Sequence, residues 1–279
     1  MIEVHAYGAT GPRVLVLHGG PGAPGYMAPV ATRLADSFRV LEPLQRCGGS
    51  EPLTVARHIA DLHEVVVARC EGFRPVLVGH SWGAMLALAF AAAYPGVSGP
   101  IALVGCGTFD PASRNAMHRL VARRTDAILR RRLDRLAQQY PDPDERFQAL
   151  GNLMLPIFSC DLDTAELVFQ SGNHRAFEET WQDMLRLQAE GIYPAAFRLI
   201  QSPVIMLHGA IDPHPGRMIC KSLQTYIPQL EYQELTHCGH YPWLEKAARD
   251  PFFRLLRHWI MQHLIPYAQT CPANGGGYP

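Results

Sequence analysis

The sequence lacks the features that mark several common protein classes. It has no net charge, because 25 Lys and Arg residues balance 25 Asp and Glu residues, so the overall charge favours neither a nucleic acid nor an acidic membrane surface as a partner. No apolar run approaches the roughly 18 residues that span a bilayer, and the longest, residues 84–93, is rich in alanine. We therefore expect neither nucleic-acid nor membrane binding.

Cysteine motifs and targeting signals are also missing. The seven cysteines are an odd number and include no CxxC pair, which is typical of reduced thiols rather than of a disulfide framework. The first ten residues, MIEVHAYGAT, contain neither the basic stretch nor the apolar run of a signal peptide. These absences predict a cytoplasmic protein, and they leave its oligomeric state open.

A glycine-rich turn, HGGPG at residues 18–22, follows the apolar run Val14–Leu17. Such a turn after a buried strand is suited to holding an anion. However, HGGPG contains neither the Lys nor the Ser or Thr of a P-loop, Pro21 removes one backbone donor, and the dinucleotide pattern GxGxxG is absent. The turn therefore predicts no nucleotide site, and the anion must be of another kind.

Short apolar runs alternate with helical stretches, which predicts an α/β fold with a mostly parallel central sheet flanked by helices. The expected strands are residues 14–17, 39–41, 76–78, 101–104, 204–207 and 230–235, with an antiparallel edge strand at 2–7. The expected helices are residues 27–37, 55–69, 82–94, 216–226 and 243–263.

The alternation breaks after Phe109 and resumes near Ile200. The intervening stretch has a helical pattern, with a turn at PDPD, residues 141–144, and it is too long for a simple connection. We expect an inserted helical cap at 109–200, a discontinuous core at 1–108 and 201–265, and a flexible tail at 266–279.

The sequence GHSWG at residues 79–83 lies between an apolar strand and a helix rich in small residues. A serine at such a sharp strand-to-helix turn is exposed above the sheet, and the two glycines relieve crowding around it. The helix N-terminus also stabilises developing negative charge. We therefore expect Ser81 to be a nucleophile rather than a helix cap.

A serine nucleophile needs a base and an orienting acid, which follow it in this order in such folds. Asp212 follows the strand at 204–207, and His240 follows the strand at 230–235. Both positions lie at carboxyl ends of strands, where α/β sheets place their sites. Asp110 is an alternative acid, and His237 is an alternative base.

Several histidines lie near these positions and raise the possibility of a metal site. The spacing of these candidates matches no metal-binding motif; they are His208, His214, His237, Cys238 and His240. We therefore expect no metal and no cofactor, and we expect Cys238 to be a packed residue rather than a nucleophile.

An oxyanion hole needs two N–H groups that converge on the tetrahedral oxygen. One comes from the residue after the nucleophile, Trp82, and the other from a loop after an early strand, where Gly20 in HGGPG is the natural candidate. We expect His18 to fix that loop through hydrogen bonds.

HGGPG, GHSWG and the Asp212 and His240 pair together resemble the α/β-hydrolase fold superfamily. Within it, HGGPG with Ser-Trp-Gly resembles the prolyl iminopeptidase branch, as does QRCGGS at residues 45–50. The resemblance covers residues 13–107 and 203–263 and leaves out the expected cap. It implies a Ser-His-Asp hydrolase that needs no cofactor.

The expected cap chooses the substrate but carries no motif. An aminopeptidase would need carboxylates there to pair with the substrate ammonium, and the candidates are Glu178, Glu179, Asp183 and Glu190, although a solvated helix face is an alternative role. Trp181, Phe177 and Phe197 are candidates for lining a pocket or for packing the cap on the core. Residues 114–135 contain eight Arg and two Asp, which predicts a solvated face or a contact with an anionic substrate or partner.

Together these features predict a serine hydrolase that cleaves an ester or amide of a small molecule, or a short peptide, through an acyl-enzyme. A prolyl iminopeptidase-type aminopeptidase is one alternative. A ligand receptor or signalling protein with slow turnover on the same scaffold is another, because the fold alone does not determine function.

Overall fold

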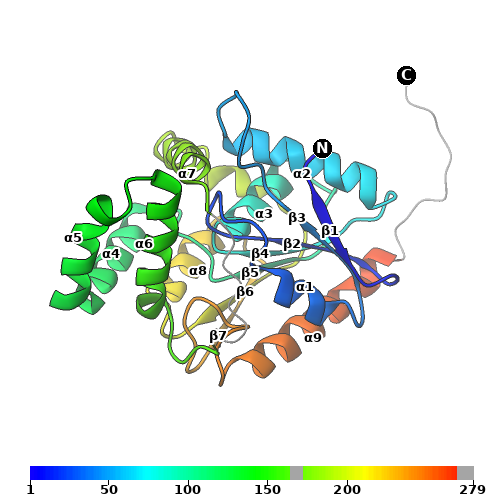
Figure 1. Ribbon diagram of the computed structural model, residues 1–279. Coiled ribbons are helices and arrows are strands. Elements are labelled where there is room, and N and C mark those ends of the chain that lie inside the picture. Colours follow the sequence, from blue (N-terminus) through cyan, green and yellow to red (C-terminus); the bar gives the residue numbers. More distant parts are fainter. Residues whose placement is uncertain (164–171, 269–279) are drawn as a thin grey trace.

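The computed structural model describes residues 1–163 and 172–268, and side chains of the last helix as far as Leu264. Within these residues the chain forms a seven-stranded sheet with helices on both faces (Figure 1). The strand order is β1-β3-β2-β4-β5-β6-β7, and only β1 is antiparallel to its neighbour. The predicted α/β fold and the antiparallel edge strand are thereby confirmed.

The strands match the apolar runs closely, because parallel strands covered on both faces are apolar throughout. Their bounds are β1 Val4–Tyr7, β2 Arg13–Leu17, β3 Arg39–Pro43, β4 Val76–His80, β5 Ile101–Val104, β6 Val204–Gly209 and β7 Leu230–Leu235. Successive side chains point to opposite faces, so Val14 and Val16 enter one buried cluster while Leu15 and Leu17 enter the other.

Two groups of helices cover the two faces of the sheet. The first group is α1 (Ala28–Leu34) and α9 (Arg249–Ala268). The second is α2 (Val55–Arg69), α3 (Trp82–Ala93) and α8 (Gly216–Gln224). Helix α9 begins six residues later than the sequence predicts, because residues 243–248 form turns instead.

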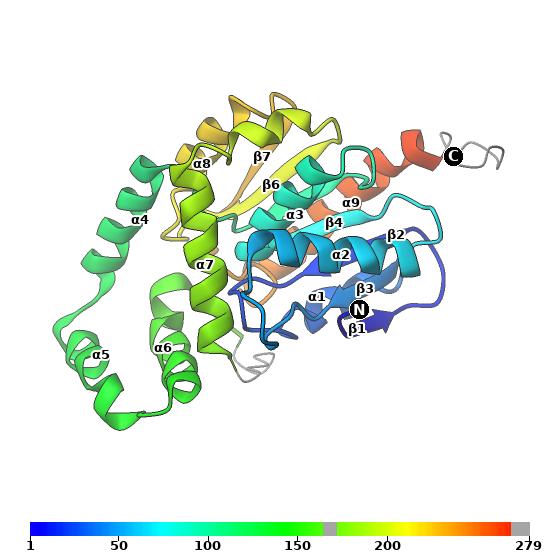
Figure 2. The same ribbon diagram turned by 90° about the horizontal axis from the view of Figure 1, so that it is seen from above.

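A helical segment connects β5 to β6, as the sequence predicts. It contains α4 (Pro111–Arg124), α5 (Ala127–Gln139), α6 (Pro143–Phe158), α7 (His174–Ala189) and a short 3₁₀ helix at Ala195–Leu199. Figure 2 shows α4, α5 and α6 to one side of the sheet, with α7 between them and α2. The PDPD stretch turns at Asp142, which caps α6, and Pro143 already belongs to that helix.

None of the helices in residues 1–163 and 172–268 combines the length and the apolar character that crossing a membrane requires. The expected flexible tail lies outside the described residues from 269 onward.

Candidate active site

Ser81 occupies a strained turn between β4 and α3. Its backbone angles are φ 53° and ψ −114°, a combination that L-residues rarely adopt. A Cβ at Gly79 would lie 2.3 Å from the Gly83 carbonyl oxygen, and a Cβ at Gly83 would lie 2.2 Å from the Leu17 carbonyl oxygen. The turn therefore needs glycine at both positions of GHSWG.

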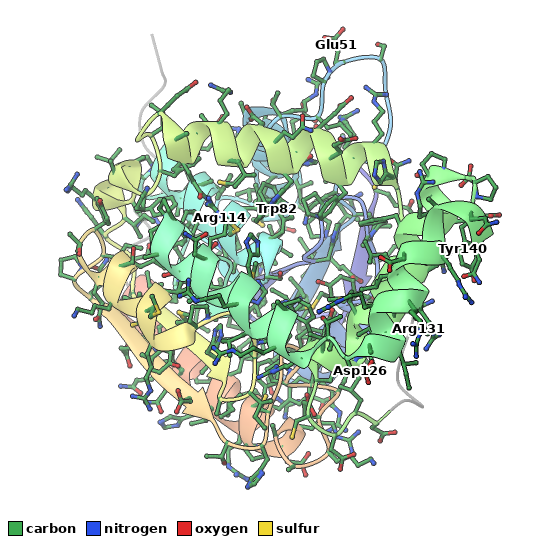
Figure 3. All side chains as sticks on the ribbon, turned by 90° about the vertical axis from the view of Figure 1, so that its left-hand side faces the viewer. Glu51, Trp82, Arg114, Asp126, Arg131 and Tyr140 are labelled. Carbon is green, nitrogen blue, oxygen red and sulfur yellow. The ribbon has the colours of Figure 1, made fainter. Side chains whose placement is uncertain are left out.

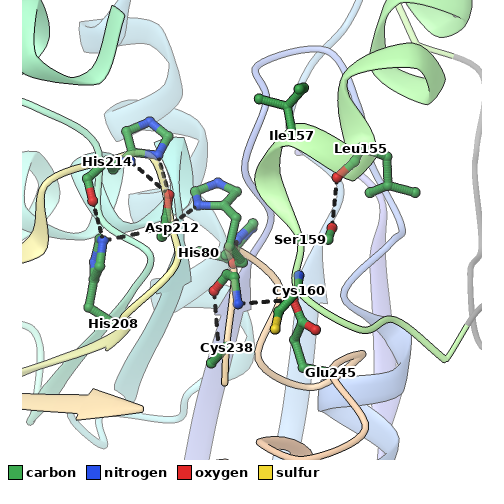
Figure 4. Close-up of polar contacts among 12 residues, drawn as sticks. His80, Leu155, Ile157, Ser159, Cys160, His208, Asp212, His214, Cys238 and Glu245 are labelled. Atoms are coloured by element: carbon green, nitrogen blue, oxygen red, sulfur yellow. Dashed lines mark hydrogen bonds and ion pairs between the residues drawn. The ribbon is translucent and has the colours of Figure 1, made fainter. Parts of the chain in front are cut away.

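His240 and Asp212 meet at the carboxyl ends of β6 and β7. The Nδ1 atom of His240 and Oδ2 of Asp212 are 2.6 Å apart, and both residues are buried. Asp212 is labelled in Figure 4. Ser81 and His240 line the same cavity. Among the described residues the Ser81 hydroxyl has no hydrogen bond to His240. A hydrogen bond between a nucleophile and its base often tightens only when substrate binds.

Asp212 is surrounded by three histidines. Its Oδ1 accepts from the backbone N–H and the ring Nδ1 of His214, each at 2.9 Å, and His208 Nε2 lies 3.4 Å from Oδ2. Burial alone would raise the pKa of Asp212, but His240, His214 and His208 hold that pKa well below its usual value. Asp212 is therefore ionised. Burial in turn lowers the pKa of His240, against the opposing effect of Asp212.

The possible metal ligands divide into two sets. Asp212, His214 and His240 each offer a ligand atom, and these atoms lie within 4.8 Å of one another, but short hydrogen bonds already join them. His237 is exposed with φ 51°, and the buried thiol of Cys238 donates to the Gly239 carbonyl oxygen. His208 and His214 therefore contact Asp212. The spacing of these histidines in the sequence could not show this role.

The alternative acid, Asp110, has a different role. Its carboxylate accepts from the backbone N–H of Ser113 at 2.8 Å and from the Ser113 hydroxyl at 2.7 Å. It therefore caps the N-terminus of α4, and Asp212 is the acid that contacts His240.

The HGGPG loop is fixed by its histidine, as the sequence predicts. His18 Nδ1 donates to the Gly19 carbonyl oxygen at 3.0 Å, and Nε2 accepts from the Gln45 backbone N–H at 3.1 Å. Burial lowers the pKa of His18 to about 4, so the ring is neutral and Nε2 is free to accept. The Gln45 side chain donates to the His18 carbonyl oxygen and accepts from the Trp82 indole, both at 2.7 Å.

The two predicted oxyanion donors belong to the HGGPG loop and to the first turn of α3. Gly20 lines the cavity with φ 48°, and Trp82 is the first residue of α3, whose N–H has no partner inside the helix. By contrast, the Gly19 N–H donates to the Tyr26 hydroxyl at 2.6 Å. Of the backbone N–H groups of Gly19 and Gly20, that of Gly20 is therefore the one available to an oxyanion.

His80, inside GHSWG, belongs to a buried network that the sequence did not reveal. Its Nε2 donates to the His240 carbonyl oxygen at 2.9 Å, and its Nδ1 accepts from the Tyr26 hydroxyl at 2.6 Å. Burial lowers the pKa of His80 well below its usual value. Tyr26 thus connects the HGGPG loop to the strand before Ser81 through one hydroxyl group.

A cavity of about 380 Å³ lies over Ser81, between the sheet and α6. Its described lining is largely apolar, with the amides of Gln148 and Asn152 as polar additions, and contains no Asp, Glu, Lys or Arg. The apolar side chains are Ala23, Pro24, Phe147, Leu150, Met154, Leu155, Phe158, Phe177 and Leu244.

Of the substrate-binding candidates, only Phe177 lies among the described residues that line the cavity. Trp181 packs against the core cluster. Glu179 pairs with Arg175 at 2.7 Å and accepts from the Leu53 backbone N–H at 2.9 Å. Glu178 is exposed and accepts from Gln182. Trp181, Glu178 and Glu179 are therefore not among the described residues that line the cavity, where a contact with substrate would place them.

The other two acidic candidates are engaged in a similar way. Asp183 accepts from the Val55 backbone N–H at 2.8 Å, so together with Glu179 it holds the chain leading into α2. Arg186 pairs with Asp183 and with Glu190, both at 2.7 Å.

The arginine-rich stretch lies on α4 and α5, on the outer side of the inserted helices (Figure 3). None of its arginines is among the described residues that line the cavity over Ser81. Arg124 donates to the Ile157 carbonyl oxygen at 2.8 Å, and Arg114 donates to Gln188. The exposed arginines are Arg119, Arg123, Arg130, Arg131, Arg132 and Arg135.

Comparison with known proteins places these features in a family. The chain is 25% identical to a protein from Lactobacillus crispatus (strain ST1) named proline iminopeptidase, over 90% of each chain. VinJ has a similar fold, with a TM-score of 0.67 at 19% identity over 93% of this chain and 94% of VinJ. A thermophilic esterase from Thermogutta terrifontis also has a similar fold, with a TM-score of 0.62 at 20% identity over 94% of this chain and 93% of the esterase. The alpha/beta hydrolase family model matches residues 14–254, and the chain therefore belongs to the alpha/beta hydrolase family.

Proposed function

We propose that the chain is a serine hydrolase that cleaves carboxylic esters of small, uncharged molecules through an acyl-enzyme. One observation carries the proposal: Ser81 and His240 line one cavity, and His240 is hydrogen-bonded to the buried Asp212 at 2.6 Å. A nucleophile, a base and an orienting acid are the groups that acyl transfer requires.

In the first half-reaction, the Ser81 hydroxyl attacks the ester carbonyl carbon while His240 Nε2 accepts its proton. Asp212 holds the proton on His240 Nδ1 and stabilises the imidazolium. His240 then protonates the departing alcohol. In the second half-reaction His240 takes a proton from water, which attacks the carbonyl carbon of the acyl group on Ser81. His240 then returns the proton to the Ser81 oxygen as the ester bond to Ser81 breaks, which releases the carboxylic acid and restores both side chains.

The tetrahedral intermediate places negative charge on the former carbonyl oxygen. We assign its two donors to the backbone N–H groups of Gly20 and Trp82, which lie on the loop and the helix that border Ser81. Removal of one such donor typically costs a factor of about 10²–10³ in kcat. The His18, Gln45 and Trp82 side-chain network holds this loop against α3.

The lining of the cavity favours an ester with an apolar acyl group over a peptide with a free amine. The relative named proline iminopeptidase raises aminopeptidase activity as an alternative, which would require carboxylates facing the substrate ammonium. The described cavity lining contains no Asp or Glu, and Glu179, Asp183 and Glu190 are engaged with arginines. We further propose that residues 109–200 act as a cap that excludes water from Ser81 and selects the acyl group.

A substrate panel tests this proposal. p-Nitrophenyl esters from acetate to octanoate are compared with the p-nitroanilides of proline and alanine at equal enzyme concentration. We expect kcat/KM to be highest for a medium-length acyl ester, with little turnover of the anilides. A preference for proline p-nitroanilide would establish the aminopeptidase instead. A single burst of p-nitrophenol without further turnover would favour the alternative of a ligand receptor or signalling protein with slow turnover.

A further inference from the structure

Glu245 is a fully buried carboxylate next to the loop that carries His240. Figure 4 shows Glu245 beside Cys160. The Oε1 atom of Glu245 accepts from the backbone N–H groups of Gly239 at 2.9 Å and Cys160 at 2.8 Å, and its Oε2 accepts from that of Asp161 at 2.6 Å. One side chain therefore binds two segments that are about eighty residues apart in sequence. Gly239 immediately precedes His240, and Cys160 and Asp161 follow the end of α6.

We propose that Glu245 is a positioning residue that fastens the end of α6 to the His240 loop, so that filling the cavity under α6 controls the position of the imidazole. The inference rests on the proposed function, because it assigns His240 as the base. It adds a role for a residue that does not itself touch the substrate.

Direct contacts between the two segments support this link. The His240 backbone N–H donates to the carbonyl oxygen of Phe158, the last residue of α6, at 2.6 Å. A Cβ at Gly239 would lie 2.4 Å from that same oxygen, so the two backbones approach as closely as glycine permits. Leu162 and Glu245 also form an isolated antiparallel bridge. A movement of the end of α6 must therefore be transmitted to His240.

The other end of this link is the substrate cavity. Helix α6 supplies much of its described lining, from Phe147 to Phe158. The ring of Phe158 lies 5.6 Å from the ring of His240, centre to centre. An acyl chain that packs on α6 therefore contacts the element that holds the His240 backbone.

Glutamine is the appropriate substitution because it keeps the shape of Glu245 and replaces an acceptor oxygen with a donor group. An amide nitrogen cannot accept from a backbone N–H, so at least one of the three donors is left without a partner inside the protein. Lys246→Ala is the matched control. It removes an exposed ion pair with Asp161 at 2.9 Å that joins the same two segments, and exposed pairs contribute little.

The test compares the wild type, Glu245→Gln and Lys246→Ala on two substrates, p-nitrophenyl acetate and p-nitrophenyl hexanoate. We expect Glu245→Gln to lower kcat on hexanoate at least tenfold and on acetate by a clearly smaller factor, with little change in KM. Lys246→Ala should leave kcat on both esters as in the wild type. If Glu245 had only a structural role, its substitution would lower kcat on both substrates by the same factor. That result, or no change in kcat at all, would overturn the proposal.

A second measurement needs no variant and therefore does not depend on the folding of Glu245→Gln. The wild type is treated with methyl or hexyl phosphonate esters, and backbone hydrogen exchange is followed by mass spectrometry in residues 155–163 and 236–246. We expect the hexyl adduct to slow exchange in both segments together, compared with the methyl adduct. Slowing in one segment only, or in neither, would overturn the link. A lack of reaction with either phosphonate would instead count against the proposed function.

Discussion

Acid should weaken the contact between α2 and α7, because His58 is buried between these helices in its neutral form. His58 is 2% exposed, and its Nε2 donates to the Thr180 hydroxyl at 2.9 Å, which in turn donates to the Leu53 carbonyl oxygen at 3.0 Å. The other ring nitrogen, Nδ1, is buried and has no hydrogen-bond partner among the residues that the structure describes. Protonation of Nδ1 would therefore create a buried charge and a buried donor that nothing accepts.

The size of this effect follows from the pKa. Burial lowers the pKa of His58 from 6.5 to about 4. The unfolded chain binds the proton from about pH 6.5 downward, while the folded chain resists it until about pH 4, so the stability present above pH 6.5 is lost as the pH falls through this interval. At pH 5 the loss from this one residue is about 2 kcal/mol.

Urea unfolding at pH 7.5 and pH 5.0 measures this loss in the wild type, His58→Gln and Thr180→Val. The wild type should lose more than 2 kcal/mol, because burial also lowers the pKa of His18 and His80. His58→Gln should lose about 2 kcal/mol less than the wild type over the same interval. Thr180→Val removes the hydrogen-bond partner and keeps the titrating ring, so it should retain most of the pH dependence. An equal loss in His58→Gln and the wild type would refute the reasoning.

Three further outcomes are expected. The kcat/KM of ester hydrolysis should fall on acidification with a midpoint below 6.5, because burial lowers the pKa of the base His240; a pH profile with a midpoint above that value would contradict this. Asp212→Asn should lower kcat by roughly 10³–10⁴-fold, since the imidazole loses the group that fixes its tautomer, and a loss under tenfold in initial-rate assays would contradict the role of Asp212. Gly83→Ala should lower the free energy of unfolding by about 1–3 kcal/mol, because its Cβ would lie 2.2 Å from the Leu17 carbonyl oxygen; a wild-type urea midpoint would contradict that steric argument.

Local signals in the sequence predicted the core elements well. Helix α2 has the predicted bounds, Val55–Arg69, because Thr54 caps it by accepting from the Arg57 backbone N–H. Helix α9 was predicted to start too early because residues 243–248 carry a helical pattern, but Glu245 faces inward and binds backbone N–H groups instead. A pattern of hydrophobic residues cannot show where a polar side chain finds its partner.

The site was predictable to the extent that it follows strand ends. Ser81, Asp212 and His240 each follow a strand of one parallel sheet, so topology brings them to one edge. The contacts of Tyr26 with His80 and of Gln45 with Trp82 join residues that are distant in sequence. No local pattern in the sequence indicates these contacts, because only the folded backbone brings the side chains together.

The inserted helices were the least predictable part. The carboxylates of Glu179 and Asp183 looked suited to a substrate ammonium, whereas they accept from backbone N–H groups at Leu53 and Val55. Charge alone does not distinguish a ligand from a cap for a neighbouring chain segment. The composition of the cavity depends instead on which face of α6 turns toward Ser81.

The central claim is that Ser81 is the activated nucleophile of a hydrolase. A fluorophosphonate probe, followed by tryptic digestion and mass spectrometry, tests this claim most directly. We expect one adduct per chain, located on Ser81, and no adduct in a folded Ser81→Ala variant. Folded wild-type protein that remains unlabelled, or that carries the adduct on another residue, would contradict the role of Ser81 as the nucleophile.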